Sequence, residues 1–192
     1  GSVNPFATYE VDINQLTLKG DKGVKADSVE VGFELARLGL QDRVQLVAHR
    51  STQKEGVYLR IYEDGKLVRQ ECYTDDLPDG PFKLRAQLYG HSWGAFIEEN
   101  GHTDYIGYVS VKNNFSKTID FRRKTDAAQA TFNVISNLKG CSAVGGARSY
   151  LSSGIGQADI RLISNEDLSP YMDDNRLWFT FSCRGIDIFQ SA

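Results

Sequence analysis

One aspartate of this chain stands in an apolar stretch, where a carboxylate is costly to bury. Asp159 has an apolar neighbour on each side, in an alternating segment that predicts a β-strand over 158–163. A buried carboxylate is expensive unless it is paired or functional, and a functional one would act as a base or a nucleophile. Two plainer interpretations stay open: an outward-facing strand residue, and an ion pair with Arg148 or Arg161.

Aromatic and cationic side chains offer a second kind of chemistry, the binding of polar ligands. Trp93 lies in a glycine-rich turn, and Tyr105 follows an Asn-Gly turn. Aromatic rings at such positions can stack on the apolar faces of sugar rings. Arg148 and Arg161 are the cations that we expect at a ligand. Trp93 has an alternative role as a plug that closes a corner of the core.

The other acidic clusters are weaker candidates. Glu30 and Glu34 share one face of a predicted strand, about 13 Å apart at roughly 3.3 Å per residue. This separation exceeds that of paired catalytic carboxylates, so we interpret them as a solvated strand face. Asp75, Asp76 and Asp79 could hold Ca²⁺ in one loop, although a simple turn explains the same residues. We expect no other metal site, because the histidines lack metal-ligand spacing. We also expect no cofactor.

The segments that would position these residues have a period of two, which is typical of β-strands. Alternating apolar residues predict strands over 9–13, 29–35, 56–62, 82–88 and 130–134, among others. Asp-Gly at 64–65 and Asn-Gly at 100–101 lie between such strands and predict type I′ hairpins. Only 124–129 predicts a helical turn. The pattern therefore predicts an all-β fold, an antiparallel jelly-roll sandwich over residues 3–139.

The composition of the chain changes after residue 139. Glycine and serine are concentrated over 140–156, which predicts a connector. Strand patterns return at 158–163, 176–182 and 186–189. This additional short meander, residues 157–192, would either complete the sandwich or form a partial second β domain, and we favour the second option.

Residues 8 to about 137 resemble the laminin-G/concanavalin-A-like jelly roll that accompanies bacterial carbohydrate-active enzymes. The resemblance is carried by an order of parts: the strand 56–62, its turn 64–66, the strand 81–88, and the strand and hairpin 96–101. Phe82 stands where that family usually has tryptophan. The resemblance implies an ancillary sandwich that recognises carbohydrate.

Residues 156–192 resemble the first blade of a five-bladed β-propeller glycoside hydrolase of the arabinanase/fructosidase type. Asp159 followed by the strand 177–182 has the order of that blade, and 185–188 resembles its third strand. The usual Asp-Pro dipeptide is absent, because Ile160 follows the aspartate. The resemblance implies that Asp159 is one of two catalytic carboxylates. The other blades would come from the remainder of the polypeptide or from a second chain.

Two functional hypotheses follow. The chain is the ancillary sandwich and the start of the catalytic propeller of a polysaccharide-processing glycoside hydrolase, or it is a stand-alone lectin-like or adhesion module without catalysis. The expected partner is a glycan or polysaccharide, although the second hypothesis also allows a protein, and both imply an extracellular or periplasmic location. Nucleic acid is an unsuitable partner, because the chain has 22 Lys and Arg against 25 Asp and Glu and so carries a net charge of −3. We expect no membrane partner, because no apolar run approaches the roughly 20 residues that span a bilayer.

Overall fold

The structure is a computed structural model of the 192-residue chain. It describes residues 3–20, 23, 25–37, 41–89, 92–110, 121–137, 142–152 and 156–184. The chain divides into two compact units, Gly1–Ser152 and Ser153–Ala192. Among the described residues, no helix has the length and apolar character needed to cross a membrane.

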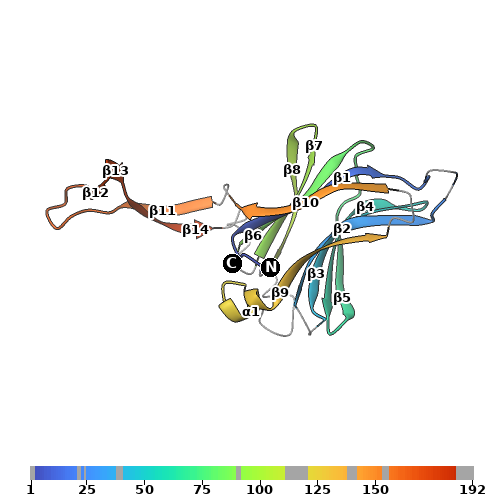
Figure 1. The fold of residues 1–192 in the computed structure, drawn as a ribbon, viewed down its shortest axis with the longest axis horizontal. Helices are drawn as coiled ribbons and strands as arrows, with labels where there is room; N and C mark the ends of the chain where they lie inside the picture. The colour runs from blue at the N-terminus through green and yellow to red at the C-terminus, as the bar shows by residue number, and fades with distance from the viewer. Residues whose placement is uncertain are drawn as a thin grey trace. The chain divides into compact units, whose positions relative to one another are not determined.

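The first unit is a sandwich of two five-stranded antiparallel sheets (Figure 1), which confirms the predicted all-β fold. In order across the sheet, the first sheet contains β10 (Ser142–Leu151), β1 (Ala7–Leu16), β6 (Phe82–Tyr89), β7 (Ser92–Glu99) and β8 (His102–Ser110). The second sheet contains β5 (Lys66–Thr74), β4 (Glu55–Glu63), β3 (Arg43–Ser51), β2 (Ser28–Arg37) and β9 (Ala130–Asn137). The predicted helical turn is α1 (Lys124–Ala128), which precedes β9.

The core lies between the two sheets and follows from the alternation along each strand. Tyr9, Val11 and Ile13 of β1 are buried there, and residues of β2 such as Phe33 meet them from the second sheet. Because successive side chains of a strand point to opposite faces, the residues between them point away from the core. This alternation leaves the opposite face of the first sheet free to carry polar side chains.

Both predicted hairpins are present. Asp64 and Gly65 join β4 to β5 with φ values of 48° and 79°, and Asn100 and Gly101 join β7 to β8 with 52° and 81°. These left-handed conformations at both central residues are those of a type I′ turn, which matches the twist of the two strands.

The segment that the sequence predicts as a connector, 140–156, instead contains β10. This strand pairs with β1 from Ala7 opposite Leu151 to Leu16 opposite Ser142, and completes the edge of the first sheet. Gly145 and Gly146 lie at an irregularity in this pairing. A Cβ on Gly145 would lie 2.6 Å from the side-chain oxygen of Asn14, so a larger residue there would require the Asn14 side chain to move.

The second unit forms sheets of its own. β11 (Gly156–Leu162) pairs antiparallel with β14 (Phe179–Arg184), and β12 (Met172–Asp173) pairs with β13 (Arg176–Leu177). The predicted strands 158–163 and 176–182 thus pair with each other. The third predicted strand, 186–189, lies outside the described residues.

Candidate functional site

The face of the first sheet that points away from the core carries three rows of side chains, which we call the outer face. Strand registers place one residue of each strand in every row. The central row consists of Arg148, Glu10, Arg85, Phe96 and Tyr105. The flanking rows consist of Tyr150, Thr8, Gln87, Gly94 and Tyr108 on one side and of Gly146, Asp12, Lys83, Glu98 and Thr103 on the other. The outer face therefore combines residues from almost the whole length of the first unit.

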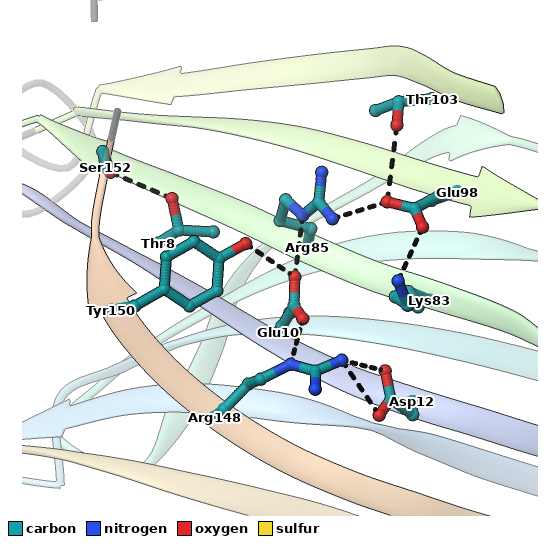
Figure 2. A network of polar contacts seen from close by, with 10 residues as sticks. All are labelled: Thr8, Glu10, Asp12, Lys83, Arg85, Glu98, Thr103, Arg148, Tyr150 and Ser152. Carbon is teal, nitrogen blue, oxygen red and sulfur yellow. Dashed lines mark hydrogen bonds and ion pairs between the residues drawn. The ribbon is translucent and has the colours of Figure 1, made fainter. Parts of the chain in front are cut away.

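Glu10 is the centre of a polar network on the outer face (Figure 2). Its side chain is buried, and it accepts hydrogen bonds from Arg85 Nε and Tyr150 Oη, both at 2.9 Å, and from Arg148 Nε. Burial by itself raises the pKa of Glu10, but the hydrogen bonds from Arg148, Tyr150 and Arg85 outweigh it and hold the pKa below its ordinary value. Glu10 is thus an ionised anchor for side chains from β6 and β10.

The network continues in both directions from Glu10. Arg148 Nη2 donates to both carboxylate oxygens of Asp12, at 2.9 and 3.1 Å. On the other side, Arg85 Nη2 lies 2.5 Å from Glu98 Oε2, and Lys83 Nζ lies 2.6 Å from Glu98 Oε1. Each carboxylate of the outer face therefore has a cationic partner (Figure 2).

Two exposed tyrosines lie at the edges of the outer face. Tyr105 of β8 is 46% exposed, and its ring meets the edge of the Phe96 ring at a centroid distance of 5.6 Å. Tyr150 of β10 is 42% exposed. Gly94 leaves space for the rings of Phe96 and Tyr105, because a Cβ at this position would lie 3.4 Å from the first ring and 3.5 Å from the second. Aromatic surface and hydrogen-bonding groups thus occur together on one open face.

Trp93, the first aromatic residue predicted to bind a ligand, lies in the core instead. It is 1% exposed, and its ring meets the ring of Phe33 edge-on at a centroid distance of 6.2 Å. The alternation of β7 places it on the inner side of the strand, whereas Phe96 points outward. No face of the indole is therefore open to a sugar, and the alternative interpretation as part of the core is the correct one.

Asp159 and Arg161 belong to the second unit, and the setting of Asp159 differs from the expected one. The residue is exposed, and it has a φ of 54° at an irregularity where Ala158 pairs with Ser182 and Arg161 with Thr180. Asp159 is thus not a carboxylate buried among apolar side chains. Arg148 lies on the outer face, where its partners are Glu10 and Asp12. The catalytic role of Asp159 and the binding role of Arg161 stay predictions.

The two glutamates interpreted as a solvated strand face are paired with other side chains. Glu30 Oε1 lies 2.8 Å from His49 Nδ1 and 2.6 Å from Arg60 Nη2, on the second sheet. Burial raises the pKa of Glu30, but the hydrogen bonds and charges of Arg60 and His49 lower it below its ordinary value. Glu34 accepts a hydrogen bond from Gln45 Nε2 at 2.8 Å. The sequence pattern identified their shared face but not their partners.

The acidic loop proposed for Ca²⁺ forms turn contacts. The amide of Asp76 donates to Thr74 Oγ1 at 3.1 Å, and Asp79 lies 3.5 Å from Arg50 Nη2. Among the residues that the structure describes, no group of three or more His, Cys, Asp and Glu is arranged to hold a metal ion. The loop therefore gives no support to a calcium site.

Of the outer face, the sequence predicts only Arg148 and Tyr105 as site residues, and it does not single out Glu10 or Tyr150. The alternation of Tyr9, Val11 and Ile13 does place Glu10 on the outward side of its strand. Its importance depends on β10, which the sequence did not predict as a strand. The sequence therefore places Tyr150 in a connector rather than on a binding surface.

No protein-family model and no curated protein matches the chain. Among solved structures, it is similar to the GH43B protein of a Bacteroides ovatus xyloglucan PUL, with a TM-score of 0.51 and 12% identity over 76% of this chain and 26% of that one. It is also similar to two galectins. For sheep galectin-11 in complex with glycerol the TM-score is 0.48 and the identity 12%, and for chicken galectin 2 they are 0.49 and 8%. Each of these similarities covers 78% of this chain and 93% of the galectin. At these identities the likeness concerns the fold alone. The present chain spans little more than a quarter of the GH43B protein.

Proposed function

We propose that the sandwich is a carbohydrate-binding module and that the outer face is its binding surface. The observation that carries this proposal is the central row, in which the exposed ring of Tyr105 and the guanidinium of Arg148 share one open sheet face. Carbohydrate sites combine aromatic rings for the apolar faces of sugars with fixed polar groups for their hydroxyls. The outer face supplies both.

The guanidinium of Arg148 is already oriented on the outer face by its ion pairs. Its side chain is 52% exposed, although it is bound to the buried carboxylate of Glu10. The bonds to Glu10 and Asp12 use Nε and Nη2, so that Nη1 takes part in none of them and is a donor for a sugar hydroxyl. Because the guanidinium is already oriented, binding costs less side-chain entropy than it would for a mobile arginine.

The second unit favours the wider proposal of an ancillary sandwich joined to the start of a catalytic propeller. Its described residues form two-stranded sheets, which are marginal by themselves. Ten of its large apolar side chains are 36–84% exposed: Ile160, Leu162, Ile163, Leu168, Tyr171, Met172, Leu177, Trp178, Phe179 and Phe181. Apolar exposure of this extent is typical of a site that binds other protein segments. The remainder of a longer polypeptide, or a second chain, would supply the other blades, and an extracellular or periplasmic location fits a polysaccharide substrate.

The similarity to the GH43B protein supports the same arrangement, because there a sandwich of this fold is part of a much longer chain named for a xyloglucan PUL. In this proposal Asp159 is one of the two carboxylates of a glycoside hydrolase. The alternative is a lectin-like or adhesion module without catalysis, which requires the outer face but not Asp159.

Binding is tested with the wild-type chain and two matched tyrosine variants on a panel of neutral and acidic polysaccharides. We expect Tyr105→Ala to weaken binding about tenfold in affinity electrophoresis and calorimetry, because it removes the exposed ring of the central row. Tyr171→Ala is the control, because Tyr171 is 42% exposed but lies in the second unit. Absence of binding to every polysaccharide, or an equal loss in both variants, would refute the proposal.

A further inference from the structure

The central row of the outer face is much longer than one sugar ring. It crosses all five strands of the first sheet, from Arg148 on the edge strand β10 to Tyr105 on the edge strand β8. Four steps between neighbouring strands, each of about 4.8 Å, give a length of about 19 Å. A ligand that contacts both ends must therefore contain several sugar units in an extended arrangement.

The two edge strands of the sheet each carry an exposed aromatic ring on the outer face. Tyr105 of β8 ends the central row, and Tyr150 of β10 lies in the flanking row, two residues from Arg148. On the strands between, Glu10 of β1 and Arg85 of β6 bind each other in the central row, and β7 contributes the partly buried ring of Phe96. A chain laid across the strands would stack on a ring near each end and meet hydrogen-bonding groups between them.

The charges of the outer face are balanced and already paired. The three rows contain three carboxylates, Glu10, Asp12 and Glu98, and three cations, Lys83, Arg85 and Arg148. Each carboxylate is bound to at least one of these cations. An anionic polysaccharide would have to compete with these carboxylates for their cationic partners, whereas the hydroxyl groups of a neutral one can bond to the network without breaking it.

From the length of the row, the exposed aromatic rings on both edge strands and the balanced charge of the outer face, we infer that the outer face binds several consecutive sugar units of a neutral polysaccharide chain, extended across the strands. This inference rests on the proposed carbohydrate-binding function and specifies its ligand. It requires that affinity grows with chain length until both edge strands are engaged.

The first experiment measures affinity by calorimetry for xyloglucan, arabinoxylan and galactomannan, which are neutral, and for polygalacturonate and alginate, which are acidic. Oligosaccharides of one to six sugar units are then prepared from the neutral polymer that binds most tightly. We expect that polymer to bind more tightly than either acidic polymer, and affinity to rise at least about tenfold between the disaccharide and the hexasaccharide.

The second experiment compares Tyr105→Ala and Arg148→Ala, which alter the two ends of the central row. Each is expected to weaken hexasaccharide binding about tenfold, whereas at most one of them affects a disaccharide, because a disaccharide cannot reach both ends. Arg69→Ala is the matched control, because Arg69 forms a part-exposed ion pair with Glu71 on the second sheet. Circular dichroism of each variant verifies that the fold is intact.

The possible outcomes distinguish this inference from the proposed carbohydrate-binding function on which it rests. If no polysaccharide binds, the proposed function itself fails. If only acidic polymers bind, or if a monosaccharide binds as tightly as the hexasaccharide, the carbohydrate-binding function stands and the inference is overturned. Equal effects of both end variants on the disaccharide and the hexasaccharide would overturn it as well.

Discussion

Glu10 shows how one buried carboxylate can organise an exposed surface. Its partners come from two strands, Arg85 from β6 and Arg148 and Tyr150 from β10, so that it joins the edge strand to the middle of the sheet. Ion pairs on a protein surface usually contribute little to stability. Here the carboxylate is buried, and its removal would leave several donors without their acceptor, which is the more costly situation.

We therefore expect Glu10→Gln to lower the free energy of unfolding by about 2 kcal/mol at pH 7, because the amide cannot replace the charge that three donors share. Glu71→Gln, in a part-exposed ion pair with Arg69, is the control and should cost less than about 1 kcal/mol. Urea denaturation of the two variants measures both values. Equal stability of the two variants would contradict the assigned role of Glu10.

The same substitution has a predictable dependence on pH. The folded state holds the pKa of Glu10 below its ordinary value of 4.5, so the ionised carboxylate stabilises the fold fully at pH values above 4.5. This stabilisation is lost as the pH falls through the lowered pKa. The difference in unfolding free energy between the wild-type chain and Glu10→Gln should thus be constant near neutrality and narrow in acid. A difference that widened in acid would exclude this linkage.

At the scale of elements, the sandwich is closed where the edge strands β5 and β8 approach each other. The ring of Tyr73 from β5 lies against Gly107 of β8, where a Cβ would come within 2.6 Å of the ring. Burial raises the pKa of Tyr73 above its ordinary range, in keeping with a ring held between the sheets. Arg69 and Glu71 of β5 pair with each other, and charged residues on an exposed edge strand discourage pairing with other chains.

Gly107→Ala is expected to destabilise the sandwich by about 1–3 kcal/mol, because the new methyl group would collide with an aromatic ring that has little room to move. Gly80→Ala is the control, because a Cβ there meets no atom within 4 Å. The midpoints of thermal unfolding measure the difference. In the double variant with Tyr73→Ala the loss should be smaller than the sum of the two single losses, and strict additivity would contradict the contact.

At the scale of the whole molecule, the two units differ in how well their apolar side chains are buried. The first has a continuous core and a polar outer face, whereas the described part of the second exposes most of its large apolar side chains. A module that only binds glycan could function with the first unit alone. A glycoside hydrolase requires the second unit to be completed by other β-strands and to supply a catalytic carboxylate.

Asp159→Asn in the longest native polypeptide separates these two possibilities. If Asp159 is catalytic, polysaccharide hydrolysis should fall on the order of a hundredfold or more, because the amide can act neither as a base nor as a nucleophile. Asp173→Asn, another exposed aspartate of the second unit, should leave hydrolysis unchanged. Release of reducing sugar is the measurement. Full activity of Asp159→Asn would remove its catalytic role and leave the binding module.

The sequence predicted those parts of the fold that depend on near neighbours in the chain. Alternation identified most strands of both sheets, Asp-Gly and Asn-Gly identified the two hairpins, and α1 was found from its local pattern. The sequence failed at β10, because its glycines and serines are more typical of a loop than of a strand. It also failed at Trp93, where the adjacent glycine suggested a turn but the strand alternation determined the burial.

By itself, then, the sequence determined the all-β class, the sandwich and two of its turns, since these follow from the period of apolar residues and from backbone conformations available to a few residue types. Only the tertiary structure decided that Arg148 and Glu10, 138 residues apart, share one row of the outer face. The physical reason is strand register. The pairing of strands that are distant in sequence aligns their side chains, and no local pattern in either strand specifies which partner it will meet.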